Sequence, residues 1–132
     1  MKKFLMLAIV AGLSMMFFGC GAAQIYNVNN NAIEGASDTQ VSSSDVEKAI
    51  LRAGGGLGWV MKKVKDGQIQ GTLTLRTHVA IVSIKYNTKE YSINYVDSTN
   101  LDYNAAANTI HSNYNGWVQN LNRAIQVQIG LI

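Results

Sequence analysis

The chain has 132 residues, a formal net charge of +3, one cysteine and no proline. This length predicts one domain with short appendages, and a single cysteine excludes an intramolecular disulfide. The basic charge suggests a nucleic acid or a membrane as partner, but Lys2 and Lys3 belong to the leader described below, and the remaining nine basic residues nearly balance eight acidic ones. The cluster of Lys62, Lys63 and Lys65 lacks the interleaved stacking aromatics that single-strand binders use. We therefore expect no nucleic-acid partner.

Residues 1–19 have the organisation of a signal peptide. Lys2 and Lys3 precede an apolar stretch that runs from Phe4 to Phe18. This stretch is shorter than the ~20 residues that a permanent membrane-spanning helix needs. We therefore expect a leader that is removed on export.

The leader ends in Phe17-Phe18-Gly19-Cys20, which resembles the lipobox of bacterial lipoproteins, where a small residue precedes an invariant cysteine. The resemblance implies that the Cys20 thiol receives a diacylglyceryl group, that the leader is cut before Cys20, and that the new amine is acylated with a fatty acid such as palmitate. Phe17 departs from the leucine that is usual at its position. Because two or more acyl chains anchor a protein stably, the expected product is a membrane-bound lipoprotein. The alternative is a cysteine that merely ends an apolar leader.

The residue after the cysteine is Gly21. In enteric-type lipoproteins an aspartate at this position favours retention in the inner membrane. The family behaviour therefore implies the outer membrane for this chain, and we expect the domain on the periplasmic face rather than at the cell surface.

Residues 20–43 are predicted to contain the acylated cysteine and a flexible tether. The segment is rich in Asn, Ser, Ala and Gly, and its isolated apolar residues, among them Ile25, Val28 and Ile33, follow no period. A flexible linker of this length reaches about 25 Å root-mean-square, which would lift a domain clear of the lipid headgroups. The compact domain is expected over residues 44–132.

A helix is expected at the start of this domain. The run from Ser44 to Glu47 fits a capping box, in which two side chains satisfy free backbone amides. Val46, Ala49 and Ile50 then fall on one helical face. The triple glycine at residues 54–56 is expected to end the helix.

Strands and a second helix follow. Apolar and polar alternation predicts strands over residues 59–65, 68–76, 79–86 and 91–95, and the polar face of the second strand indicates a sheet that is covered on one side. A helix is expected over residues 112–128, which carry a continuous apolar stripe. The predicted fold is α+β with two layers, a four-stranded antiparallel meander with one N-terminal and one C-terminal helix on the same face.

The C-terminal half carries a further pattern. Its motifs are Thr77-His78-Val79-Ala80, Tyr91-Ser92-Ile93-Asn94-Tyr95, Asp97-Ser98, Asn100-Leu101-Asp102-Tyr103, Ile110-His111-Ser112-Asn113-Tyr114-Asn115 and Trp117-Val118-Gln119-Asn120-Leu121. Together they resemble a family of short proteobacterial lipoproteins of unassigned function, over roughly residues 58–125. The resemblance implies the class of protein and an envelope location, and it implies no activity.

A glycine run and a pair of histidines suggest ligand binding, but neither meets the requirements of a known site. The glycine run at residues 54–58 precedes a strand and lacks both the Lys-Ser/Thr pair and the following helix of a phosphate loop. His78 and His111 are too few for a structural zinc site, although a mixed site of His111 with Asp97 and Asp102 is conceivable. We predict no metal and no cofactor.

Ser98, His111 and Asp102 are the residue types of a hydrolase triad. Such a triad is recognised by geometry and by a strained turn at the nucleophile, and Ser98 has no G-x-S-x-G motif around it. We therefore predict no catalytic residue.

The segment from Asp97 to His111 is the best candidate for a functional surface. It is long for an unstructured connection in a small domain, and the Tyr and Trp side chains near its end suit recognition. The alternative assigns Tyr114 and Trp117 to the core and the polar loop residues to turns. The predicted interaction surface consists of Asp97, Ser98, Asn100, Asp102, Tyr103, His111, Tyr114, Asn115 and Trp117.

The sequence leaves three functions open. The first, which we expect, is a non-enzymatic envelope module that binds another envelope protein or polymer through this surface. The second is a small-ligand or glycan binder with a cleft lined by Tyr91, Tyr95, Tyr103 and His111. The third is a hydrolase, which requires His111 within hydrogen-bond reach of Ser98.

Overall fold

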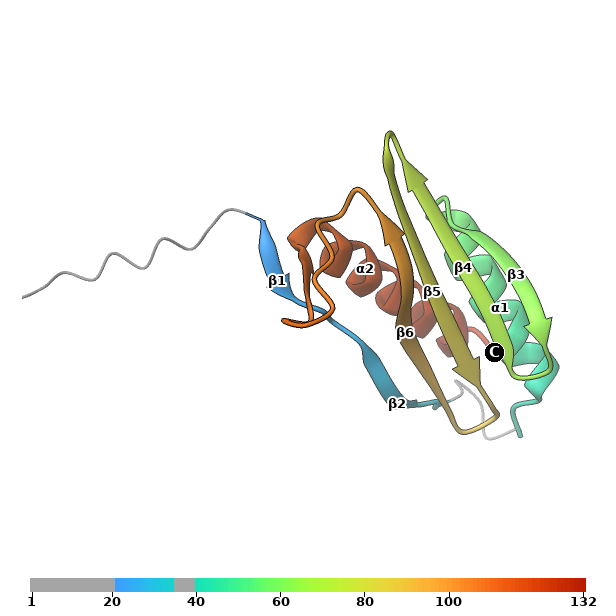
Figure 1. Ribbon diagram of the computed structural model, residues 1–132. Coiled ribbons are helices and arrows are strands. Elements are labelled where there is room, and N and C mark those ends of the chain that lie inside the picture. The colour runs from blue at the N-terminus through green and yellow to red at the C-terminus, as the bar shows by residue number, and fades with distance from the viewer. Residues whose placement is uncertain (1–20, 35–39) are drawn as a thin grey trace, which may run out of the picture.

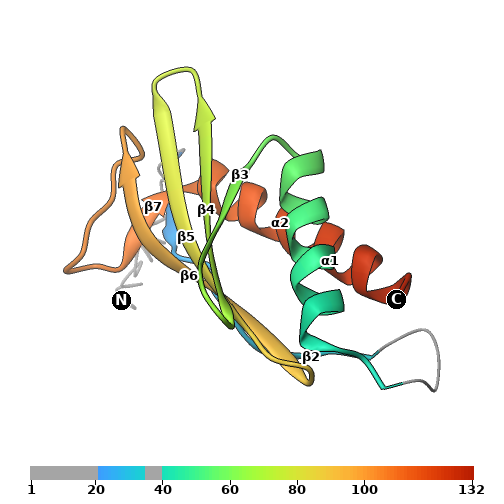
Figure 2. The ribbon, with the colours of Figure 1, turned by 90° about the vertical axis from the view of Figure 1, so that its right-hand side faces the viewer.

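Two helices cover one face of an antiparallel sheet (Figure 1, Figure 2). The computed structural model describes residues 21–34 and 40–132, so the predicted leader and Cys20 lie outside the described residues. The two-layer α+β architecture predicted from the sequence is confirmed. In chain order the elements are β1 (Ala22–Gln24), β2 (Val28–Ala32), α1 (Ser43–Gly56), β3 (Val60–Lys65), β4 (Gln68–Leu75), β5 (His78–Tyr86), β6 (Glu90–Thr99), β7 (Thr109–His111) and α2 (Ser112–Gly130).

The main sheet has five strands in the order β2-β6-β5-β4-β3, and every neighbouring pair is antiparallel. The predicted meander corresponds to β3 through β6 and is confirmed. The predicted number of strands, four, is nevertheless too small. Strand β2 extends the main sheet beyond β6, and β1 forms a separate two-stranded sheet with β7. Both additional pairings use residues from the predicted tether.

The prediction of a flexible tether is therefore wrong for residues 21–34. Ala23 pairs with Ile110 of β7, and Val28 pairs with Ile93 of β6. The partners lie more than sixty positions later in the chain, so no local periodicity reveals them. In the described part of the chain the packed domain begins at Gly21, and not at residue 44.

Helix α1 begins two residues earlier than predicted. The N-cap is Ser42, whose Oγ accepts a hydrogen bond from the Asp45 backbone N–H at 3.1 Å. The predicted capping box is therefore wrong, because the carboxylate of Glu47 accepts from the Tyr86 hydroxyl at 2.8 Å and pairs with the Lys63 ammonium at 3.0 Å. This pairing ties α1 to β3 and β5.

Helix α1 also continues through Gly56, although the triple glycine was predicted to end it. Gly54 instead permits close packing, because a Cβ at this position would overlap the side chain of Met61 on β3. The chain turns after the helix at Gly58, whose φ of 86° lies in the left-handed region that glycine adopts readily.

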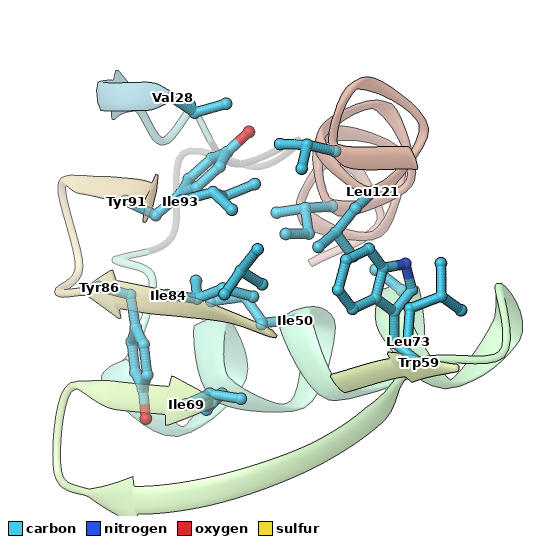
Figure 3. Packing of buried hydrophobic residues seen from close by; sticks show 14 of the residues in the cluster. Val28, Ile50, Trp59, Ile69, Leu73, Ile84, Tyr86, Tyr91, Ile93 and Leu121 are labelled. Carbon is cyan, nitrogen blue, oxygen red and sulfur yellow. The ribbon is translucent and has the colours of Figure 1, made fainter. Parts of the chain in front are cut away.

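The hydrophobic core lies between the helices and the sheet. Figure 3 shows Ile50 of α1 and Leu121 of α2 directed toward Ile84 and Ile93 of the sheet, and each of these four side chains has 0% exposure. Burying an aliphatic side chain of this size contributes about 1.5–3 kcal/mol relative to leaving it exposed. Val28 of β2 belongs to the same cluster with 6% exposure, so the N-terminal segment is packed into the domain.

The predicted loop between the last strand and the second helix is shorter than expected. Strand β6 continues through Thr99 after a register shift opposite Ile81 and Val82, and β7 occupies the end of the predicted loop. The connection proper is residues 100–108. Helix α2 begins at Ser112 as predicted and runs two residues beyond the predicted end, to Gly130.

Candidate functional site

The predicted interaction surface comes from the end of β6, the following loop and the first turns of α2. The structure separates its members into a tyrosine cluster, a histidine pair and a contact with the N-terminal segment. Asp97 and Asp102 are exposed beside these groups. The nine residues therefore lie at one end of the domain but do not act as one surface.

The tyrosine cluster is built on Tyr95, near the end of β6. The Tyr103 ring stacks on the Tyr95 ring with centroids 4.5 Å apart, and Tyr114 meets it edge-on at 5.6 Å. The hydroxyl groups of Tyr95 and Ser98 share a hydrogen bond of 2.8 Å. Burial raises the pKa of the Tyr95 hydroxyl, so this group stays protonated and neutral in the cluster.

Tyr114 and Tyr103 have opposite roles in this cluster. Tyr114 has 0% exposure, and its hydroxyl has no hydrogen-bond partner among the described residues. Burial therefore raises the pKa of Tyr114, and the core alternative is confirmed for this residue. Tyr103 keeps 44% exposure, so its ring is available at the surface while its other face is held by Tyr95.

The histidine pair connects β5, the loop and α2. Nδ1 of His78 donates to the backbone carbonyl of Asn100 at 2.7 Å, because a carbonyl can only accept. Nδ1 of His111 accepts from the Asn113 backbone N–H at 3.2 Å and thereby caps α2. The two imidazole centroids are 6.5 Å apart, and Trp117, which is half-buried, lies 6.3 Å from His78. Both histidines therefore hold backbone elements in place.

The hydrogen bonds of these residues form neither the hydrolase triad nor the metal site that the sequence analysis considered. Ser98 bonds to Tyr95, and His111 uses Nδ1 for the helix cap. In neutral His111 the proton then resides on Nε2, which makes this atom a donor and not a metal ligand. Within residues 21–34 and 40–132, no group of three or more His, Cys, Asp or Glu side chains is placed to hold a metal ion, so the mixed site of His111 with Asp97 and Asp102 is not formed.

The connection between β6 and β7 is held in one conformation. Asn100, Asp102 and Asn108 have φ values of 55°, 53° and 53°, and Asn and Asp tolerate this left-handed region better than other side chains. Leu101 between them is buried, with 1% exposure, and its carbonyl accepts from the His111 N–H at 2.8 Å. The loop that presents Tyr103 is therefore anchored on both sides.

Asn115, predicted as a surface residue, binds the N-terminal segment. Its amide oxygen accepts from the Tyr26 N–H at 2.9 Å, and its amide nitrogen donates to the Gln24 carbonyl at 2.7 Å. Ile25, between these two, donates its N–H to the Asn108 carbonyl at 3.0 Å. Helix α2 and the loop thus hold both edges of this segment.

The start of the described chain is fixed to α2 as well. The Gly21 carbonyl accepts a hydrogen bond from the Ser112 N–H at 2.6 Å, which satisfies one of the free amides in the first turn of the helix. Residues 21–34 were missed as structured because strand pairing with β6 and β7 leaves no pattern in their own sequence.

Two segments that meet at this end of the domain carry no formal charge, and Asp97 and Asp102 are exposed beside them. Residues 21–33 and 103–122 contain no Asp, Glu, Lys or Arg, and the pairing of β1 with β7 brings the two segments together. Figure 1 shows β1 beside the start of α2 at one side of the molecule, with α1 and β3 at the other side. We call the surface formed by residues 21–27 and 103–117 the uncharged end. The absence of charge from two distant segments is a signal that could have been found in the sequence.

The predicted cleft of Tyr91, Tyr95, Tyr103 and His111 is not assembled as expected. The Tyr91 hydroxyl accepts from the Asn31 amide at 3.0 Å and donates to Asn122, and burial raises its pKa to about 12. Tyr91 lines an open hollow of about 340 Å³ together with Asn31, Ala32, Glu34, Gln126 and Ile129. Tyr95 and Tyr103 instead stack against each other.

Comparison with protein-family models, curated proteins and solved structures finds no match for this chain. The resemblance to short proteobacterial lipoproteins therefore stays a prediction. In the part of the chain that the structure describes, neither helix is long and apolar enough to span a membrane.

Proposed function

We propose that this chain is a lipid-anchored cell-envelope protein whose folded domain is a non-enzymatic interaction module. The observation that carries the proposal is the start of the sequence, where Lys2 and Lys3, an apolar stretch to Phe18 and the pair Gly19-Cys20 occur in the order of a lipoprotein leader. Cys20 is the only thiol in the chain and stands directly before the first described residue of the folded domain. Acylation accounts for a single unpaired cysteine in an exported protein.

The loop around Tyr103 supports an interaction role. A recognition residue is most effective when its ring is already ordered before binding, because less conformational entropy is then lost. The Tyr103 ring meets this condition through its stack on Tyr95, and the buried Leu101 holds the loop beside it. An envelope protein or polymer is the partner that we expect for an exposed tyrosine of this kind.

A small-ligand or glycan site is the second candidate. The hollow beside Tyr91 supports it, since polar Asn31 and Gln126 and apolar Ile129 line it together. A hydrolase draws no support from the structure's hydrogen bonds, because Ser98 and His111 each bond to other groups.

Membrane fractionation of the full-length chain tests the proposal. Wild-type protein and Cys20→Ser are expressed with the native leader in a bacterial host and separated on a density gradient, with the exposed Ser44→Ala as a matched control. The wild type and Ser44→Ala are expected in the outer-membrane fraction, and Cys20→Ser is expected to leave it. A soluble wild-type protein, or Cys20→Ser in the same fraction as the wild type, would contradict the proposal.

A further inference from the structure

We infer that the uncharged end of the domain lies directly against the lipid bilayer. This inference rests on the proposed acylation of Cys20 and adds to it the orientation of the domain and the surface that meets the membrane. The occupant of this surface is the headgroup region of the bilayer in which the acyl chains are embedded.

No residue separates the proposed acylated cysteine from the first described residue of the fold. Cys20 is bonded to Gly21, and consecutive Cα atoms are about 3.8 Å apart. The Gly21 carbonyl is held by the Ser112 N–H at 2.6 Å, and Ala22 pairs with His111. A diacylglyceryl group on Cys20 therefore enters the membrane beside the first turn of α2.

The fixed segment also resists detachment. To gain the freedom of a tether, residues 22–26 would have to give up their pairing with β7, the bond from Ile25 to Asn108 and both bonds to Asn115. A backbone group that loses its partner in a partly buried place costs free energy comparable to a lost hydrogen bond. The domain therefore stays at the membrane and keeps one end toward it.

A further point is the chemistry of that end. Transfer of a charged group out of water is costly unless the charge is paired. Residues 21–27 and 103–117 contain no charged side chain, whereas the exposed Asp97 and Asp102 beside them must stay in water at the rim of the contact. The exposed residues of the uncharged end include Asn104, Asn108 and Asn113. Tyr103, with 44% exposure, lies at the border of this surface, where one part of the ring remains open to a partner. Amphipathic Tyr and Trp rings are enriched at the level of the headgroups. Asp102, which precedes Tyr103, marks the border of this surface.

The opposite side of the domain carries exposed charged side chains. Lys48 and Arg52 of α1 and Lys62 and Lys65 of β3 are exposed there, and Figure 2 shows α1 and β3 turned to the viewer on that side. A partner in the envelope space would meet this side of the domain, whereas a partner at Tyr103 would bind close to the membrane plane.

Site-directed spin labelling tests the inference in the lipidated protein. Because acylation consumes the Cys20 thiol, a cysteine introduced at Asn113→Cys or Lys62→Cys is the single site for a nitroxide. Each lipidated protein is inserted into vesicles of phosphatidylethanolamine and phosphatidylglycerol, after mass spectrometry has shown the acyl chains. Collision of the nitroxide with a water-soluble nickel chelate is compared between vesicles and detergent.

The nitroxide at position 113 is expected to lose several-fold of its accessibility in vesicles, while the one at position 62 keeps its accessibility. A second variant inserts a flexible segment of about twenty Gly and Ser residues, beginning with Gly, between Cys20 and Gly21, which gives a reach of about 25 Å. This insertion is expected to restore the accessibility of position 113 and to leave acylation intact.

The possible results separate the inference from the proposed function. A protein without acyl chains overturns the proposed function itself. A lipidated protein with equal accessibility at both positions in vesicles overturns the inference alone. Protection of position 113 by oligomers of N-acetylglucosamine, and not by vesicles, would assign the uncharged end to glycan binding and would also overturn it.

Discussion

The side chain of Asn115 donates a hydrogen bond to the carbonyl of Gln24 at 2.7 Å, although the two residues lie 91 positions apart in the chain. The same amide accepts from the Tyr26 N–H at 2.9 Å. One side chain thereby takes the place of a strand partner where the N-terminal segment passes from β1 to β2. This contact, together with the pairing of β1 with β7, fixes the start of the described chain to the domain.

Replacement of Asn115 by alanine is expected to loosen the N-terminal segment. The exposed Gln24 carbonyl and the partly buried Tyr26 N–H lose their partner, and because water can replace it, each hydrogen bond contributes about 0.5–1.5 kcal/mol. Urea unfolding should show a loss of this size, and hydrogen exchange of the Tyr26 amide should accelerate. Gln119→Ala, an exposed change on the same helix, serves as control and should leave both unchanged. Equal behaviour of the two variants would contradict the role of Asn115.

The packing of α1 on β3 predicts different effects of alanine at two adjacent glycines. A Cβ at position 54 would overlap the Met61 side chain, whereas one at position 55 meets nothing within 4 Å. Gly54→Ala forces the flexible Met61 side chain to move and should therefore be less stable than Gly55→Ala by about 1–3 kcal/mol. Gly55→Ala should be neutral or stabilising by up to about 1 kcal/mol, because alanine favours the helix. Thermal unfolding of both variants measures this difference, and equal stability of the two variants would show that Met61 moves aside without cost.

The pairing of Glu47 predicts a dependence of stability on acid pH. Hydrogen bonds from Lys63 and then from Tyr86 lower the pKa of the Glu47 carboxyl below its ordinary value of 4.5. The stabilisation is therefore present above the unfolded pKa and is lost as the pH falls through the folded pKa. Glu47→Gln should be less stable than the wild type at neutral pH, and the difference should vanish in acid. Urea midpoints over a pH series measure this, and a difference that is constant with pH would rule out the ionic contribution.

The buried tyrosines predict a loss of stability in alkali. Burial raises the pKa of Tyr91 from 10.0 to about 12, so the folded state holds this proton after the unfolded chain has released it. The stabilisation is complete below the unfolded pKa and is lost as the pH rises through the folded pKa. The unfolding midpoint should fall between these values, and Tyr91→Phe should reduce the fall. An identical decline in the variant would exclude Tyr91 as its source.

The meander and both helices could be predicted because their signals are local. Ile69 and Leu73 alternate with polar residues along β4 and are buried, with 0% and 6% exposure. The position of the helix cap could not be predicted from residue type, because Ser42, Ser43 and Ser44 are consecutive serines that can all act as caps. The structure places the cap at Ser42.

The N-terminal strands could not be predicted, for a physical reason. Strand β2 is Val-Asn-Asn-Asn-Ala, a sequence without the alternation that marks a half-buried strand, and its stabilising partner β6 lies far along the chain. Pairing with distant residues overrides weak local preference. The candidate surface likewise depends on contacts between residues that are distant in the sequence. Tyr103 and Tyr114 both pack against Tyr95, one exposed and the other buried, and no local pattern distinguishes them.

The most direct test of the account is the mass of the N-terminal peptide from protein extracted from its native membrane. Acylation at Cys20 predicts a peptide that begins at this residue and carries three acyl chains or, where the amine is left free, two. A mature chain that begins upstream of Cys20, or one that begins there without lipid, would contradict the anchor and would remove the basis for the orientation of the domain.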